Sequence, residues 1–217
     1  MSKIHNAYIK VKTKYNQFVK RQKLKHKDVS IISNNCWAGS AFYQPYGLPY
    51  NTPTIGLGFL DADYMKFIQN LEYYLSITPE FVDPQTASGY SVRRKLYGRE
   101  IDYPVARLDD IFIWFTHYKS QEEAFEKWER RKKRVNLNRI LIKWSMRYNC
   151  PEDTQNLQRF LNLPYKYKIA FVPSSCTITS PDIVIVPELD TLNIVGGDET
   201  EATLRLINLT KMFNSLK

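Results

Sequence analysis

The chain has 217 residues, 43% of them hydrophobic and 14% aromatic, so it can bury a real core and is not a disordered protein. No apolar run approaches the roughly 20 residues that cross a bilayer, and the first residues lack the apolar stretch of a secretory signal peptide. The three cysteines are widely spaced and unpaired in pattern. We therefore expect no disulfide framework and no zinc site, and we expect a cytoplasmic location.

The formal net charge of +9 belongs to one end of the sequence. Residues 1–27 hold nine lysines and arginines and no acid, and the remaining 22 basic and 22 acidic side chains cancel. In this segment Ile4, Tyr8, Val11, Tyr15 and Phe18 follow helical spacing. Such a helix can lie on an anionic membrane surface, or it can pack its narrow apolar stripe on the domain. Nucleic acid is not an expected partner, because no zinc-finger spacing or aromatic RNA-binding motif is present.

The stretch from Val29 to Gly39 (VSIISNNCWAG) predicts a short buried strand that ends in a cluster of polar and aromatic residues. In open α/β sheets, ligands bind just beyond the carboxyl ends of the strands. Asn34, Asn35 and Cys36 are therefore candidate site residues. A structural alternative is a turn in which the two asparagines suit the backbone and the cysteine fills space.

Residues 44–58 are rich in proline and glycine, and they follow directly on the candidate site. Long loops in compact domains are usually functional or disordered, and the five aromatic residues from 37 to 50 argue against disorder. We expect a folded loop that covers the end of the strand. Thr52 and Thr54 are candidate hydroxyl donors, or residues that close turns.

Residues 61–75 predict a helix with one apolar face. Asp61 and Asp63 have the D-x-D spacing that holds a divalent metal in some sugar-nucleotide transferases. They also stand where a carboxylate caps a helix, and capping is the preferred interpretation. Residues 79–100 predict no regular structure.

Residues 111–117 predict a strand that ends in His117, and the S-x-x-E spacing of Ser120 and Glu123 predicts a helix that starts there. That helix carries its acids early and its bases late, which complements its dipole. The run of bases 130–134 therefore needs no ligand, although some of its members can reach a phosphate.

Further strands are predicted at 140–142, 169–172 and 183–186, with helices that begin at Pro151 and at Asp198. Strands alternating with helices indicate a single α/β domain over 28–217, a three-layer α/β/α sandwich with a mostly parallel sheet, preceded by the basic helix of 1–27.

Three blocks carry a resemblance to a known bacterial family: residues 32–39 (ISNNCWAG), 52–57 (TPTIGL) and 103–134, which contains FTHYKSQEEA and KWERRKKR. The chain resembles the domain of unknown function numbered nineteen-nineteen, over roughly residues 28–217. Members are often labelled exopolysaccharide or capsular polysaccharide biosynthesis proteins. The resemblance implies a three-layer α/β/α fold and a role in surface-glycan assembly, but no particular reaction. Where the family commonly has a glycine pair after the tryptophan, this chain has Ala38 and Gly39.

Cys36 and His117 each follow a predicted strand, and His117 is the histidine outside the basic arm. If the two strands are parallel neighbours, a thiol and an imidazole meet at one edge of the sheet, a pairing typical of nucleophilic catalysis. Asp109 or Asp110 can orient the imidazole only if the chain folds back. The first hypothesis is an acyl or related group transferase on a glycan precursor, with Cys36 as nucleophile and His117 as base; the Asn-Cys pair also resembles the nucleophile position of SGNH-like acyltransferases.

Candidate substrate-binding residues surround this pair. They are Asn34, Asn35, Trp37, Gly39, Tyr43, Thr52, Thr54, Lys119, Arg130, Arg131 and Arg134. The expected ligand is a glycan or an activated sugar or acyl donor, and no metal ligand is assigned among these residues.

Two other functions stay open. One is a metal-dependent glycosyl or glycosyl-phosphate transferase, with Asp61 and Asp63 on the metal and the arginines of 130–134 on phosphate. The other is a non-catalytic accessory protein that binds glycan or docks on the membrane. It would stack sugar rings on exposed aromatic side chains, namely Trp37, Tyr43, Tyr46 and Tyr50.

Overall fold

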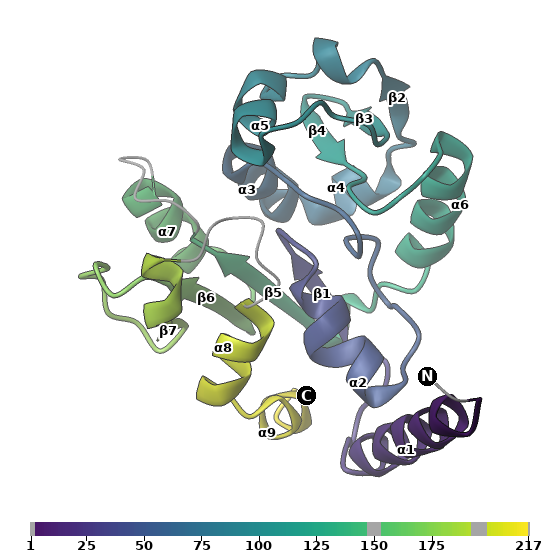
Figure 1. Cartoon of the computed structure of the whole chain (residues 1–217). Coiled ribbons are helices and arrows are strands. Elements are labelled where there is room, and N and C mark those ends of the chain that lie inside the picture. Colours follow the sequence, from purple (N-terminus) through teal and green to yellow (C-terminus); the bar gives the residue numbers. More distant parts are fainter. Residues whose placement is uncertain (1–2, 147–152, 192–198, 217) are drawn as a thin grey trace.

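The computed structural model describes residues 3–146, 153–191 and 199–216. Four short apolar runs form sheet A, whose neighbouring strands are all parallel. Its order is β1 (Ser30–Ser33), β5 (Ile140–Ser145), β6 (Lys168–Val172) and β7 (Ile183–Ile185) (Figure 1). The predicted α/β class and the predicted strands in these four runs are confirmed.

Helices cover both faces of sheet A, because its side chains alternate between two cores. Ile31 of β1 packs with the helical segment 37–46, α8 (Glu199–Leu206) and α9 (Leu209–Asn214). Ile32 points to the opposite side, toward α3 (Asp61–Gln69) and α7 (Asp153–Leu161). Sheet A is thus the middle of three layers. The starts predicted for two helices, Pro151 and Asp198, lie outside the described residues, as does Cys150.

A second sheet is inserted between β1 and β5. Sheet B is antiparallel, in the order β2 (Glu80–Val82), β3 (Val105–Leu108) and β4 (Ile111–Trp114). The hypothesis that the strand before His117 is a parallel neighbour of β1 is therefore wrong. A tight turn at Asp109, whose φ is 54°, instead pairs β4 with β3. The interpretation of 79–100 as irregular is also wrong, since this stretch holds β2 and α5 (Tyr90–Tyr97).

Sheet B nevertheless lies against the end of β1. Gly58 and Trp114 exchange both main-chain hydrogen bonds, so the chain that leaves β1 runs alongside the end of β4. The amide of Ser33 donates to the hydroxyl of Thr54 over 3.3 Å, which confirms that the loop folds over the strand end. The carboxyl ends of β1 and β4 therefore meet at residues 55–58, although the two strands belong to different sheets.

The remaining helices follow local signals with one exception. Ser120 caps α6 (Gln121–Lys132) by accepting from the amide of Glu123, as predicted. The prediction that an aspartate caps α3 is wrong, because its N-cap is Leu60 and makes no side-chain cap. Asn70 separates α3 from α4 (Leu71–Ser76). Short 3₁₀ turns complete the described chain: η2 (Pro84–Thr86), η3 (Leu137–Arg139) and η4 (Pro187–Asp190).

The basic helix α1 (Lys3–Gln22) lies outside the layers, beside α2 (Gln44–Tyr46) (Figure 1). It contacts the domain through polar groups: the Gln17 amide donates to the carbonyl of Gln44, and Arg21 donates to that of Gly47. Tyr8, Val11, Tyr15 and Phe18 are exposed, so the expectation that this stripe packs on the domain is wrong. No described helix is both long and apolar enough to cross a membrane.

Replacement of Ile142 by alanine tests the central position of β5. Ile142 is fully buried between the two flanking strands, and the cavity left behind should lower the free energy of unfolding by about 2–5 kcal/mol. The same substitution at Ile185, which is half-exposed on the edge strand β7, should cost less than about 1 kcal/mol. Urea denaturation of both variants measures the difference, and equal losses would contradict this fold.

Candidate functional site

The chain turns from β1 into a helix through Asn35 and Cys36. The side-chain oxygen of Asn35 accepts from the amide of Trp37 at 3.0 Å, which caps the first turn. The helical segment 37–46 then contains a π-helical stretch, η1 (Gly39–Tyr43), before α2. Single π turns inside helices are frequent at functional sites. The local geometry thus sets Asn35 and Cys36 at the carboxyl edge of sheet A.

A buried ion pair lies beneath this turn. The ammonium of Lys143 on β5 is 2.5 Å from a carboxylate oxygen of Glu199, which opens α8. The same ammonium donates to the amide oxygen of Asn35 at 3.0 Å, and Asn35 donates to the other oxygen of Glu199 at 2.8 Å. The hydroxyl of Ser145 also donates to Glu199, at 2.5 Å. We call Asn35, Lys143, Ser145 and Glu199 the buried polar cluster.

Strand alternation explains how a lysine enters the core. Lys143 and Ser145 share their strand face with Leu141, and that face is covered by the helical segment 37–46 and by α8. The ammonium lies 5.6 Å from the ring centre of Trp37 and 5.4 Å from that of Phe171. Lys143 has no exposed surface at all. Lys143 was not predicted from the sequence, although a lysine inside the apolar run of 140–144 indicates a partner in the interior.

Cys36 points to the other side of the strand end. Its Sγ lies 3.9 Å from the carbonyl oxygen of Leu57, a residue of the core on the α3 side of sheet A. The thiol is half-buried. Cys36 therefore lies beside residues 55–58, where the end of β1 meets the end of β4.

Tyr118 and Arg131 complete the surroundings of the thiol. Tyr118 donates to the carbonyl of Ile55 at 2.5 Å and accepts from the Arg131 guanidinium at 2.6 Å. Burial raises the pKa of Tyr118, the charge of Arg131 opposes that rise, and the nearby Cys36 adds to it. We call Cys36, Leu57, His117, Tyr118 and Arg131 the thiol site.

Gly56 is required for this packing. Its φ is +78°, and a Cβ there would lie 2.8 Å from the ring of Tyr118. The carbonyl of Gly56 accepts from the amide of His117 at 3.2 Å. The main chain of His117 is therefore bound to the same loop that Cys36 contacts. The side chain of His117 is exposed. Asp109 and Asp110 lie at the other end of β4, where they bind side chains of α3 and α4.

Most of the other predicted binding residues lie inside the fold. Asn34 pairs with the main chain of Ser145, and Tyr43 bridges the main chain of residues 29 and 31. Their substrate-binding role stays a prediction, and their observed contacts are structural. The buried members are Asn34, Asn35, Trp37, Gly39, Tyr43, Thr52 and Thr54.

The hypothesis of an exposed aromatic stacking surface is wrong. Trp37, Tyr43 and Tyr46 are buried, because the helical segment 37–46 packs these side chains against sheet A and α9. The guanidinium of Arg131 lies 4.8 Å from the ring centre of Tyr50. The fourth aromatic residue therefore already has a cation over its face.

The basic run of residues 130–134, at the end of α6 and just after it, contains one buried cation and several exposed ones. Arg131 turns inward to the thiol site, whereas Arg130 pairs with Glu126 at 2.7 Å one turn earlier. Arg134 and Lys119 are exposed, and the amide of Lys119 donates to Glu123. Of the predicted phosphate-binding residues, Arg131 is thus the one that reaches the candidate site.

The D-x-D pair does not converge on one point. Asp61 accepts from the indole of Trp144 at 3.0 Å. Asp63 is buried beside the hairpin of sheet B, where the desolvation of its carboxyl raises its pKa to about 6 against a reference value of 3.8. Within the described ranges no group of three or more histidine, cysteine, aspartate or glutamate side chains is arranged to hold a metal ion.

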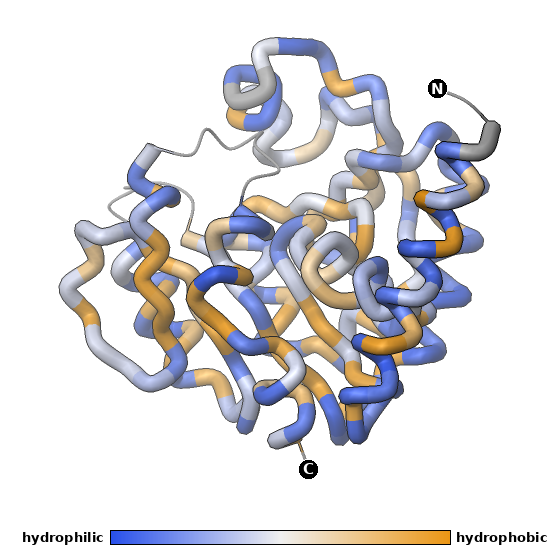
Figure 2. The backbone as a smooth tube through the Cα atoms, turned by 60° about the horizontal axis from the view of Figure 1, so that its bottom comes forward, coloured by the Kyte–Doolittle hydropathy of each residue, from blue (hydrophilic) through white to orange (hydrophobic). Residues whose placement is uncertain are grey.

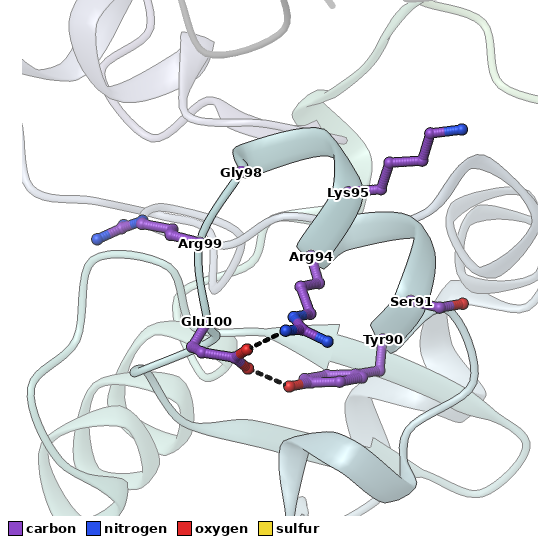
Figure 3. Close-up of a pocket in the computed structure, with 7 residues that line it drawn as sticks. All are labelled: Tyr90, Ser91, Arg94, Lys95, Gly98, Arg99 and Glu100. Carbon is purple, nitrogen blue, oxygen red and sulfur yellow. Dashed lines mark hydrogen bonds and ion pairs between the residues drawn. The ribbon is translucent and has the colours of Figure 1, made fainter.

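A cavity of about 580 Å³ lies on α5 and the turn that follows it (Figure 3). Arg94 and Tyr90 both point to Glu100, with an ion pair of 2.6 Å between Arg94 and Glu100. Lys95 and Arg99 point away from that group. The residues that line it include none of those predicted from the sequence, and its carboxylate, Glu100, already binds Tyr90 and Arg94.

Comparison with known proteins gives two matches. The family model described as "Domain of unknown function (DUF1919)" matches residues 7–198. A protein of Haemophilus influenzae described as uncharacterized is 30% identical over 173 residues, which are 76% of this chain and 75% of that protein.

Replacement of Glu199 by glutamine tests the buried polar cluster. The substitution preserves size but removes the negative charge beside the buried Lys143, so the free energy of unfolding should fall by about 3–5 kcal/mol. The matched control is Glu80→Gln, which breaks the exposed pair with Arg107 and should cost less than about 1 kcal/mol. Chemical denaturation measures both losses. Similar losses in the two variants would show that the buried ion pair contributes no more to stability than an exposed one.

Replacement of Asp63 by asparagine tests the pH dependence of folding. Folded Asp63 keeps its proton up to a pKa of about 6, whereas the unfolded group loses it near 4, so this residue makes stability fall as pH rises through that window. Asp63→Asn should stabilise the protein at pH 7 by up to about 3 kcal/mol and change little below pH 4. Thermal and urea unfolding at both pH values check this. A loss of stability at pH 7 would contradict it, and the exposed Asp102→Asn serves as control.

Proposed function

We propose a function for this chain on the premise that it belongs to the family of the domain of unknown function DUF1919. The match over residues 7–198 confirms the resemblance carried by the three sequence blocks. The proposal is that the protein is an acyl or related group transferase that modifies a glycan or a glycan precursor in surface-polysaccharide assembly. Cys36 is its nucleophile and His117 its base.

One observation carries the chemistry: a half-buried thiol lies at the start of a helix, beside a structured loop and near Tyr118, which binds a buried guanidinium. The amides in the first turn of a helix and a nearby cation both stabilise a thiolate relative to a thiol. Cys36 begins the helical turn, because its carbonyl accepts from the amide of Gly39 at 3.1 Å. Arg131 is linked to the same surroundings through Tyr118.

The proposed reaction has two transfers. The Cys36 thiolate attacks the carbonyl carbon of an activated acyl donor, a thioester forms on the protein, and the donor's leaving group departs. A hydroxyl of the glycan then attacks that thioester, His117 accepts the hydroxyl proton, and the Cys36 thiolate leaves.

His117 suits the role of base because its side chain is exposed to solvent and its main chain is bound to the loop of residues 55–58. Its amide is held by Gly56, the neighbour of the Leu57 carbonyl that Cys36 contacts. Asp109 and Asp110 take no part in the proposal, since their partners lie on α3 and α4. A side chain on an exposed turn can move onto the thiol when substrate binds, as catalytic hydrogen bonds often tighten in the complex.

The glycan acceptor follows from the labels of the resembled family, and the local chemistry is compatible with it. The thiol site has the exposed side chain of His117 and the buried guanidinium of Arg131 as hydrogen-bonding groups. The metal-dependent alternative has less support, since Asp61 binds Trp144 and Asp63 is buried beside sheet B.

Acylation of Cys36 tests the proposal directly. With p-nitrophenyl acetate as the probe, the protein should release p-nitrophenolate in a burst and gain an acetyl group on the peptide that contains Cys36. Cys36→Ser should abolish both signals, because the thiol is the attacking group. His117→Gln should keep the burst but slow the turnover that follows it by at least about 100-fold, because His117 accepts a proton in the second transfer.

Cys176→Ser is the matched control, because the Cys176 thiol is also half-buried and lies 3.8 Å from a main-chain carbonyl, that of Ile178. That variant should keep the burst and the labelled peptide. Equal labelling of the peptides of Cys36 and Cys176, or a burst that survives Cys36→Ser, would refute the nucleophile. An unchanged turnover rate in His117→Gln would refute the base.

A further inference from the structure

The helix α1 has an apolar stripe that faces away from the domain. Tyr8, Val11, Tyr15 and Phe18 are 62%, 68%, 65% and 51% exposed, and they follow one another at intervals of three and four residues. We call these four side chains the α1 stripe. Large apolar side chains exposed singly are ordinary, but a continuous stripe along about three turns of one helix is a surface that needs a partner.

The polar side of α1, rather than the stripe, holds the helix on the domain. Gln17 and Arg21 are one turn apart and bind the carbonyls of residues 44 and 47. With about 100° of rotation per residue, this side lies roughly 120° around the helix from the centre of the α1 stripe. The docking contacts therefore fix the stripe outward.

Lysines flank the α1 stripe on both edges. The Lys12 ammonium lies 6.0 Å from the ring centre of Tyr8, one turn away, and Lys14 stands between Val11 and Phe18 on the other edge. Residues 1–27 hold no acid. Figure 2 shows hydrophobic segments alternating with strongly hydrophilic ones along this helix at the edge of the molecule.

We propose that α1 docks the protein on an anionic lipid surface, with the α1 stripe inserted at the level of the headgroups and the flanking lysines on the lipid phosphates. A helix of 20 residues is about 30 Å long and can lie in the plane of the interface along its whole length. Aromatic rings and lysine stems suit that depth, since both are apolar along their body and polar at the tip. Positive charge without acids complements anionic lipid, whereas a second copy of the same basic helix would be repelled.

The test is cosedimentation of the full chain with vesicles. Vesicles of phosphatidylcholine with phosphatidylglycerol should bind the protein, and vesicles of pure phosphatidylcholine should bind it at least tenfold less. Lys12→Gln with Lys14→Gln should weaken binding by about 25-fold, at roughly fivefold for each lysine near the surface. Val11→Ser with Phe18→Ser should weaken it by at least about tenfold, because the inserted apolar area is lost.

The matched control replaces an exposed apolar and an exposed basic residue elsewhere, Val92→Ser with Lys133→Gln, and should leave binding unchanged. Circular dichroism checks that the exposed substitutions leave the fold intact. Equal binding to both kinds of vesicle would overturn the proposal. If the lysine substitutions abolish binding and the stripe substitutions do not, the partner is a general polyanion and the proposal is overturned. A dimer in light scattering that the stripe substitutions abolish would also overturn it.

Discussion

The ion pair between Lys143 and Glu199 constrains how the carboxyl edge of sheet A is built. Two charges taken out of water lose several kcal/mol of hydration each, and their attraction offsets that loss only with good geometry and further hydrogen bonds. Asn35 and Ser145 supply those bonds. The pair therefore fixes β5, the start of α8 and the end of β1 at one point, and a shift of any of them would leave a buried charge without its partners.

This constraint reaches the thiol through the chain itself. Asn35 is held by the ion pair on one side of the strand end, and the next residue, Cys36, faces residues 55–58 on the other. The amide oxygen of Asn35 also accepts from Trp37, which starts the helical segment 37–46. One asparagine thus sets both the direction of the thiol and the first helical amides beside it. The cluster positions the candidate nucleophile without touching it.

The sequence allowed the strands of sheet A and the capped helix α6 to be predicted, because apolar runs and capping residues act locally. Strand partners could not be predicted in the same way. The run of 111–114 is short and apolar, and its antiparallel pairing depends on the turn at Asp109 and on β3, which no strong pattern marks. Lys143 was missed because its partner, Glu199, is 56 residues away. An ion pair between residues far apart in the chain produces no periodic pattern in the sequence.

Because β4 belongs to sheet B, the thiol site is formed in a different way from the one expected, although its residues are the same. Two strands in one parallel sheet would bring Cys36 and His117 together by strand order alone. Here they approach one segment, 55–58, because the loop after β1 pairs with β4 and extends sheet B. That loop depends on Gly56, the residue whose left-handed backbone admits the ring of Tyr118. The Cys36 thiol, the main chain of His117 and the Arg131 guanidinium therefore all contact one folded loop between the two sheets.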